Sequence, residues 1–203
     1  FDFLPLEGGK LGLALGDISG KGVGAAILMA SLQAMLRSQA PLRGDAVDEL
    51  ASALNRLMAA STDGSKFSTF FYGVYDPAGG RLSYVNAGHN PPVLLRASGS
   101  EPERLTATGM LLGMFPEAPY KRGQVRLEPG DLLVVFSDGV SEAFNEAGEE
   151  FGEERLIELL QGMRGREAKS ICDGIAEAVS RFAGAAVQSD DVTLVVARVE
   201  ALS

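Results

Sequence analysis

The spacing of apolar residues along the chain predicts several helices. In segment 23–40, Ala, Leu and Met dominate, and Leu28 and Leu32 recur at the spacing of one helical face. We expect this helix to be broken by Pro41 and Gly44, because proline and glycine both disfavour helix continuation.

Three further segments have helical patterns. One begins at Asp45, which we interpret as an N-cap, and runs to about residue 60. The other two span residues 153–163 and 166–183.

Strand patterns fill much of the remainder, as short runs of branched and aromatic residues bounded by turns. Strands are expected over residues 1–4, 11–15, 67–75, 81–86, 92–96, 124–127, 131–137 and 192–199. Tight turns such as Asp76-Pro77-Ala78-Gly79-Gly80 imply antiparallel pairing, because parallel strands need longer crossovers. The predicted fold is therefore α+β: a two-sheet antiparallel β-sandwich flanked by helices on both faces.

Composition narrows the class of protein. With 203 residues, 46% of them hydrophobic and 22% charged, the whole chain is expected to form one soluble domain. A formal charge of −9 argues against nucleic-acid binding, and no apolar run is long enough to span a membrane. The single cysteine fits a reducing compartment, so we expect a cytoplasmic protein. Because the chain opens on Phe1 rather than Met, we expect it to be part of a longer protein.

Candidate chemistry lies in acids that follow predicted strands. Asp17 ends the strand at 11–15, Asp138 ends the strand at 131–137, and Asp190 and Asp191 precede the last strand. If these carboxylates converge, they repel one another unless cations occupy the site. Oxygen ligands without nearby His or Cys favour Mg²⁺ or Mn²⁺, and two such ions can activate water for phosphoryl hydrolysis. The alternative, that each aspartate only forms a turn or cap, stays open for any one of them.

Other chemistries are less well supported. The segment from Gly16 to Gly22 is one residue too short for a P-loop and lacks Ser or Thr after Lys21. His89 is the only histidine and lies in a predicted turn, which favours a structural role over a catalytic triad. Cys172 lies in a predicted helix without an arginine placed to hold a phosphate, so we expect a buried structural thiol.

Several motifs occur in an order that points to one family. They are Gly16-Asp17-Ile18-Ser19-Gly20-Lys21-Gly22 with Ala25-Ala26-Ile27-Leu28-Met29, Tyr84-Val85-Asn86-Ala87-Gly88-His89-Asn90-Pro91-Pro92, Gly109-Met110-Leu111-Leu112-Gly113, Leu127-Glu128-Pro129-Gly130-Asp131, Phe136-Ser137-Asp138-Gly139-Val140-Ser141-Glu142-Ala143 and Ser189-Asp190-Asp191-Val192-Thr193-Leu194. Together they resemble the metal-dependent protein serine/threonine phosphatases, specifically the bacterial SpoIIE/RsbU-type branch of the protein phosphatase 2C-like superfamily.

The resemblance implies a site for two Mn²⁺ or Mg²⁺ ions. It assigns metal binding and catalysis to Asp17, Asp138 and Asp190, adds the backbone carbonyl of Ile18 as a metal ligand, and ranks Asp191 below these as a further ligand. The family also carries a Gly-Gly-Asp-x-x-Asp segment, of which only the final acid, Asp2, is present here.

The resemblance also implies a function. We expect phosphoserine or phosphothreonine hydrolysis by a metal-activated water, acting on a partner protein. By resemblance, that partner is a phosphorylated anti-sigma-factor antagonist of a partner-switching pathway. Within this interpretation the chain is the C-terminal catalytic part of a longer regulatory protein, and a homodimer is one arrangement it could adopt. The alternative is a catalytically weak or silent signalling module that binds divalent metal and a partner protein.

Overall fold

A computed structural model describes residues 1–62, 66–188 and 190–201. The chain divides into two compact units, which are described separately. The first unit comprises Phe1–His89 and Thr106–Leu127, and the second comprises Asn90–Leu105 and Glu128–Ser203. Among the helices of the described ranges, none is both long enough and apolar enough to cross a membrane.

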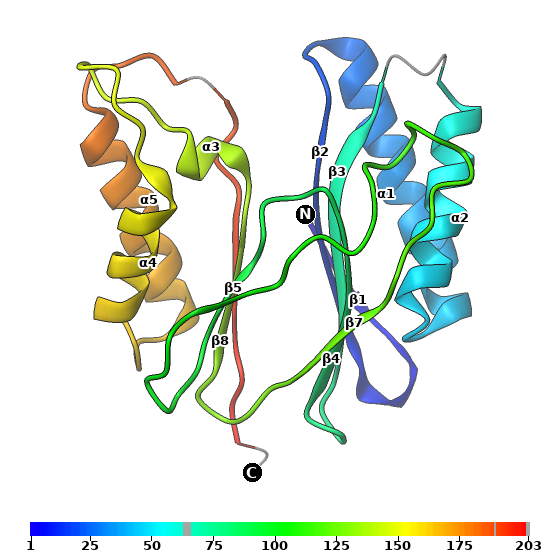
Figure 1. Cartoon of the computed structure of the whole chain (residues 1–203), viewed down its shortest axis with the longest axis horizontal. Coiled ribbons are helices and arrows are strands. Elements are labelled where there is room, and N and C mark those ends of the chain that lie inside the picture. The colour runs from blue at the N-terminus through cyan, green and yellow to red at the C-terminus, as the bar shows by residue number, and fades with distance from the viewer. Residues whose placement is uncertain (63–65, 189, 202–203) are drawn as a thin grey trace. The chain divides into compact units, whose positions relative to one another are not determined.

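The first unit is an antiparallel sheet covered by two helices on one face (Figure 1). The strands have the order β1-β2-β3-β4-β7, with bounds β1 Asp2–Pro5, β2 Leu11–Ile18, β3 Ser68–Asp76, β4 Arg81–Ala87 and β7 Gly123–Arg126. A short 3-10 turn, η1 (Glu7–Gly9), joins β1 to β2. The helices are α1 (Val23–Arg43) and α2 (Val47–Ala60).

The core of the first unit confirms the predicted helical periodicity. Leu28, Leu32 and Leu36 are all buried on one side of α1, four residues apart. They pack in one hydrophobic cluster with residues of α2 and of the sheet, including Leu54 and Tyr72. Burial of this apolar stripe, rather than propensity alone, stabilises α1.

Two details of the predicted helices are wrong. The first helix is not broken at Pro41 but runs through it to Arg43, and the backbone N–H of Gly44 closes it by donating to the Ala40 carbonyl. A proline in the last turn removes only one hydrogen bond, so the cost is limited. Asp45 is not an N-cap.

Asp45 instead forms ion pairs. Its carboxylate lies 3.5 Å from Lys10 Nζ and 3.9 Å from an Arg81 guanidinium nitrogen. The helix α2 begins two residues later, with Ala46 at the capping position and no side-chain cap. Charge pairing with the sheet therefore replaces capping at this position.

A buried asparagine fastens a long loop to α2. Asn55 is fully buried, and its amide donates to the carbonyls of Phe115 at 2.8 Å and Pro116 at 3.0 Å. Its side-chain oxygen accepts the Gly113 N–H at 2.8 Å. The Gly109-Met110-Leu111-Leu112-Gly113 motif thus ends on a polar anchor inside the core.

The second unit is a smaller antiparallel sheet with helices on one face (Figure 1). Its strand order is β6-β5-β8-β9, with bounds β5 Val93–Leu95, β6 Glu103–Arg104, β8 Leu132–Phe136 and β9 Leu194–Arg198. The helices are α3 (Asp138–Ser141), α4 (Gly152–Gly162) and α5 (Ala168–Ala183). The α+β class with two antiparallel sheets is confirmed.

The strand β8 lies in the interior of the second unit and matches the strand expected at residues 131–137. All five residues of β8 are buried, and β8 pairs with both β5 and β9. Val134 and Phe136 pack in one cluster with Leu156 of α4 and Ile175 of α5. Because β8 is apolar throughout, polar chemistry can occur only at its two ends.

Candidate functional site

Asp17 lies at the end of β2 in the first unit. Its backbone carbonyl accepts a hydrogen bond from the Ser68 hydroxyl at 2.7 Å, and Ser68 is completely buried. Asp17 is opposite Thr69 in the β2–β3 register, and Ile18 is opposite Ser68. This pairing fixes the backbone that carries the predicted carboxylate and the predicted carbonyl ligand.

The turn that follows Asp17 is held by hydrogen bonds from the start of β3. The Ser19 hydroxyl accepts the Phe67 N–H at 3.0 Å, and Lys66 Nζ donates to the Ser19 carbonyl at 3.1 Å. The turn is thus anchored by both backbone and side-chain contacts. Such anchoring keeps a functional side chain within a narrow range of positions.

Asp138 occupies the corresponding place in the second unit, directly after β8. It opens the short helix α3, and its carboxylate accepts the Gly139 N–H at 2.9 Å. The preceding residue, Ser137, is buried and joins two segments. Its hydroxyl donates to the Asp191 carbonyl and accepts the Thr193 N–H, each at 2.9 Å.

Gly139 allows the segment with Asp190 and Asp191 to lie against α3. A Cβ atom at position 139 would be 2.8 Å from the Asp191 carbonyl carbon and 3.3 Å from the Asp190 carbonyl oxygen. The first distance is shorter than real Cβ contacts, so only glycine fits without a shift. The Asp-Gly pair after β8 therefore brings Asp138 next to Asp190.

The Asp190 carboxylate is exposed and locally ordered by the backbone. It accepts the Asp191 N–H at 2.8 Å, and the Asp190 carbonyl accepts a hydrogen bond from the Gln188 side chain at 2.8 Å. Asp191 is also exposed. Ser189, the first residue of this predicted motif, lies outside the described residues.

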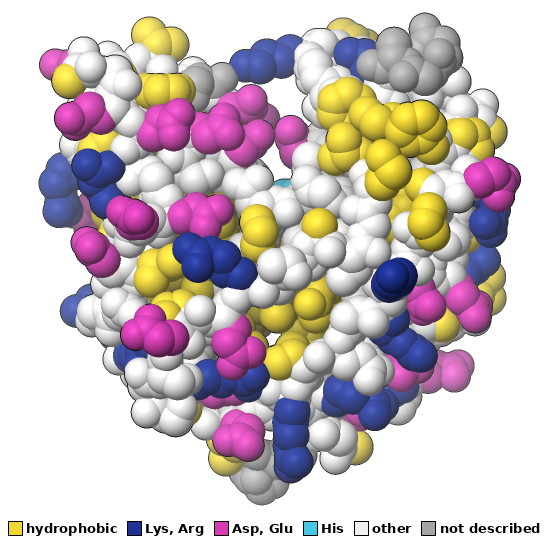
Figure 2. All heavy atoms as spheres, in the orientation of Figure 1, with side chains coloured by type: hydrophobic (Ala, Val, Ile, Leu, Met, Phe, Trp, Pro, Cys, Tyr) yellow, Lys and Arg dark blue, Asp and Glu magenta, His cyan; other side chains and the backbone are white. Residues whose placement is uncertain are grey.

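Glu142 lies in the electrostatic field of other acids of the second unit. The pKa of Glu142 is raised above its usual value, first by burial and then by the negative charges of Asp138, Glu150 and Asp190. Figure 2 shows acidic side chains gathered over the part of the second unit that carries α3. An accumulation of like charge favours a bound cation.

Glu142 is the acid that the sequence analysis did not select. It follows Asp138 by four residues, the spacing that places two side chains on one helical face, and its N–H donates to the Asp138 carbonyl at 2.7 Å. The four-residue spacing between Asp138 and Glu142 is visible in the sequence and could have identified Glu142 as a candidate.

The predicted ligands are thus divided between the units. In the second unit the backbone of Asp190 and Asp191 packs against Gly139, directly after Asp138, whereas Asp17 and Ile18 belong to the first unit. Among the described residues, no group of three or more His, Cys, Asp or Glu side chains has an arrangement suited to holding a metal ion. The available donors in the second unit are carboxylate oxygens, which is the ligand type that Mg²⁺ and Mn²⁺ prefer.

The residues assigned structural roles can also be located. His89 is buried; its Nδ1 is hydrogen-bonded to the Thr69 hydroxyl at 2.9 Å, and its N–H donates to the Asn86 side chain at 2.8 Å. Cys172 is only partly buried in α5, and burial raises the pKa of its thiol, which disfavours the reactive thiolate.

Asp2, which matches the final acid of the family's Gly-Gly-Asp-x-x-Asp segment, forms hydrogen bonds with side chains of α1. Its buried carboxylate accepts two hydrogen bonds from the Arg37 guanidinium, at 2.6 and 2.7 Å, and one from Gln33 at 3.3 Å. These contacts hold Asp2 against α1.

The chain matches a described protein family over most of its length. Residues 7–200 match the family described as Stage II sporulation protein E (SpoIIE). Protein IcfG of Synechocystis sp. is 31% identical over 96% of the chain, and phosphoserine phosphatase RsbU of Bacillus subtilis is 33% identical over 68%. The chain spans only 34% and 41% of the lengths of these two relatives.

Solved structures give the same assignment. The RsbU and RsbW domains of Rv1364c from Mycobacterium tuberculosis match with a TM-score of 0.85 and 31% identity, covering 100% of this chain and 55% of that one. The PP2C phosphatase domain of SpoIIE from Bacillus subtilis shares the fold, with a TM-score of 0.79 and 22% identity over 98% of this chain and 57% of that one. The chain belongs to the SpoIIE family and has the fold of the SpoIIE PP2C phosphatase domain.

Proposed function

We propose that the chain is a metal-dependent phosphatase that hydrolyses phosphoserine or phosphothreonine on a partner protein. The observation that carries this proposal is the close packing of the Asp190-Asp191 backbone against Gly139, directly after Asp138, in a chain that belongs to a family of serine phosphatases. Two of its relatives, RsbU and RsbP of Bacillus subtilis, are phosphoserine phosphatases.

The proposed metal ligands are all oxygen atoms. Asp17, Asp138 and Asp190 would supply carboxylates, Ile18 its backbone carbonyl, and Asp191 a further carboxylate. Two Mn²⁺ or Mg²⁺ ions bound there would make a water more acidic and neutralise charge on the phosphoryl oxygens. Besides burial, the negative charges of Asp138, Glu150 and Asp190 raise the pKa of Glu142, and a cation bound near these acids would relieve that repulsion.

In this proposal no side chain of the protein attacks the phosphorus atom; the buried serines instead position the proposed metal ligands. Ser68 holds the backbone of Asp17, and Ser137 holds that of Asp191, each through a buried hydroxyl. Neither a histidine base nor a reactive cysteine is part of the proposal, since His89 is engaged with Thr69 and the Cys172 thiol has a raised pKa. The family resemblance points to a small phosphorylated anti-sigma-factor antagonist as the substrate.

The proposal can be tested by measuring Mn²⁺-dependent hydrolysis of p-nitrophenyl phosphate and of phosphoserine, phosphothreonine and phosphotyrosine peptides. Asp17→Asn, Asp138→Asn and Asp190→Asn should each lower turnover by about a hundredfold or more, because each removes a proposed ligand charge. Asp173→Asn is the matched control, since Asp173 is exposed on α5 and pairs only with Lys169 in the described part of the chain.

Three results would contradict the proposal. They are undiminished activity in any of the three ligand variants, preference for phosphotyrosine, and activity that does not depend on divalent metal. If the parent fails to hydrolyse any substrate while Mn²⁺ still raises its melting temperature, the chain is instead a silent metal-binding module.

A further inference from the structure

The second unit contains a cavity lined by arginines, at the end of β8 opposite to Asp138. Its volume is about 190 Å³, and its walls include Arg96, Arg164, Arg166 and Arg198, with Leu132 and Ile171 as apolar contacts. Leu132 begins β8, whereas Asp138 follows its end. Five strand residues span roughly 17 Å, so the cavity is separate from the acidic cluster.

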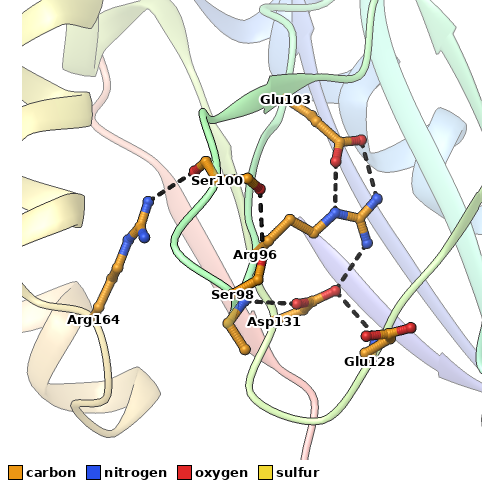
Figure 3. Close-up of polar contacts among 8 residues, drawn as sticks. Arg96, Ser98, Ser100, Glu103, Glu128, Asp131 and Arg164 are labelled. Carbon is orange, nitrogen blue, oxygen red and sulfur yellow. Dashed lines mark hydrogen bonds and ion pairs between the residues drawn. The ribbon is translucent and has the colours of Figure 1, made fainter.

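Arg96 is held in place by acids. Its guanidinium donates to both Glu103 oxygens, at 2.6 and 3.0 Å, and to Asp131 at 2.9 Å, as Figure 3 shows. Asp131 also accepts backbone N–H groups from Ala97 at 2.9 Å and Glu128 at 3.0 Å. The Arg96 charge is therefore compensated, and its side chain forms a fixed wall.

Of the other three arginines, Arg164 and Arg198 donate to backbone carbonyls rather than to acids. Arg198 on β9 donates to the carbonyls of Gly165 at 3.0 Å and Arg166 at 2.9 Å, and so positions the loop between α4 and α5. Arg164 donates to the Ser100 carbonyl at 3.1 Å (Figure 3), while its Nε is buried without a hydrogen-bond partner among the described residues.

The charge of these three side chains is not balanced locally. Within the described ranges, none of Arg164, Arg166 and Arg198 forms an ion pair, and the neighbouring acid Glu167 forms none either. Three guanidinium groups around one cavity repel one another, and this occurs in a chain whose net charge is −9. An anion in the cavity would relieve that repulsion.

We propose that this cavity binds a small phosphate-bearing anion, at a site distinct from the proposed catalytic acids. Guanidinium groups match phosphate oxygens with paired, charge-assisted hydrogen bonds, and several converging arginines favour phosphate over a single carboxylate. The volume, equal to that of about six liquid waters, accommodates a phosphate or diphosphate group with some bound water.

The test is a titration of the 203-residue chain, freed of metal by chelation and dialysis, with inorganic phosphate, pyrophosphate, adenosine diphosphate and citrate. Without metal, the acidic cluster repels these anions, so binding reports on the arginine cavity. We expect phosphate and pyrophosphate to raise the melting temperature and to shift backbone NMR signals of residues 97, 130 and 164–166. Adenosine diphosphate distinguishes a nucleotide from a free phosphate as the source of the group.

Two variants test the assignment to these side chains. Arg166→Ala and Arg164→Gln should each weaken pyrophosphate binding by about tenfold, the loss of one charge-assisted hydrogen bond. Arg166 is exposed and its side chain supports no other group in the described structure, so its removal should leave the fold intact. Arg181→Ala, an arginine of α5 that pairs with Glu177 away from the cavity, makes the same charge change and should have no effect.

The proposal is overturned if pyrophosphate neither stabilises the parent nor shifts the cavity signals. It is also overturned if Arg166→Ala binds pyrophosphate as tightly as the parent and the control Arg181→Ala do. A third contradicting result is that citrate raises the melting temperature as much as pyrophosphate does. The last result would indicate a general anion site rather than a phosphate site.

Discussion

Replacement of Gly139 by alanine tests how the acids of the second unit are brought together. The added methyl group would lie 2.8 Å from the carbonyl carbon of Asp191, whereas carbon atoms in contact are normally about 3.5–4.0 Å apart. Either α3 or the segment with Asp190 must therefore move by about 1 Å. The Ser137 hydrogen bonds to this segment, both 2.9 Å long, resist that movement.

The expected magnitude follows from this overlap. Excess volume in a packed region costs about 1–3 kcal/mol, and a loss of about 2 kcal/mol lowers the melting temperature of a domain of this size by about 4–8 °C. A displacement of about 1 Å in catalytic groups typically costs about a hundredfold in rate. Gly139→Ala should therefore reduce phosphatase turnover much more than it reduces stability at assay temperature.

Thermal unfolding and Mn²⁺-dependent turnover of the parent and two alanine variants would check this expectation. Gly162→Ala is the matched control, because no atom lies within 4 Å of a Cβ built at that helical position of α4. It should be neutral or stabilising by up to about 1 kcal/mol, as for glycine replaced by alanine in a helix. If Gly139→Ala matched the parent in both measurements, close approach would not be what Gly139 provides.

For three other substitutions, the structure predicts whether the protein becomes more or less stable. Tyr72→Phe should raise the melting temperature by about 2–4 °C, because it removes a buried hydroxyl that has no hydrogen-bond partner in the described structure; a decrease would reveal a partner. Asn55→Ala should cost about 3 kcal/mol in thermal unfolding, because three backbone groups lose their hydrogen bonds to a fully buried side chain; a cost under about 1 kcal/mol would contradict this anchoring role. Arg37 lowers the folded-state pKa of Asp2 below its ordinary 3.8, so Asp2 stabilises the fold above that pH and ceases to do so as pH falls through the folded value. Asp2→Asn should accordingly lower the melting temperature by about 2–4 °C at pH 7, and the difference should shrink as the pH falls through the folded-state pKa of Asp2; a pH-independent difference would disprove the charge argument.

The regular elements could be predicted because their side-chain patterns match their burial. The run from Leu132 to Phe136 is apolar throughout and forms the fully buried β8, and the apolar spacing in segment 23–40 gives the buried face of α1. The two-residue β6 and the four-residue α3 are too short for any periodicity to be visible. The end of α1 was misplaced because proline is tolerated in a last turn.

The candidate site could be predicted only in part, because some of its features arise from tertiary packing and not from a local sequence pattern. Aspartates at strand ends are visible in the sequence, and in the structure the backbone of Asp190 and Asp191 packs against Gly139, next to Asp138. The raised pKa of Glu142 depends on burial and on the charges of three other acids, and both arise from tertiary packing. The arginine cavity joins residues from β5, β9 and the loop before α5, and no short sequence motif contains them.

The position of the two charged sites on one strand has a thermodynamic consequence. Because β8 is buried throughout, its acidic end near Asp138 and its basic end near Leu132 are separated by roughly 17 Å of apolar strand. That distance exceeds the Debye length of about 10 Å at 0.1 M salt, so direct coupling between solvent-accessible charges should be weak. The stabilisation by Mn²⁺ and the stabilisation by pyrophosphate should therefore add, once metal chelation by free pyrophosphate is corrected for. Arg166→Ala should remove the second effect and leave the first unchanged, as measured by melting temperature across a grid of both ligands. A loss of the Mn²⁺ effect in that variant would show that the two ends of β8 act as one site.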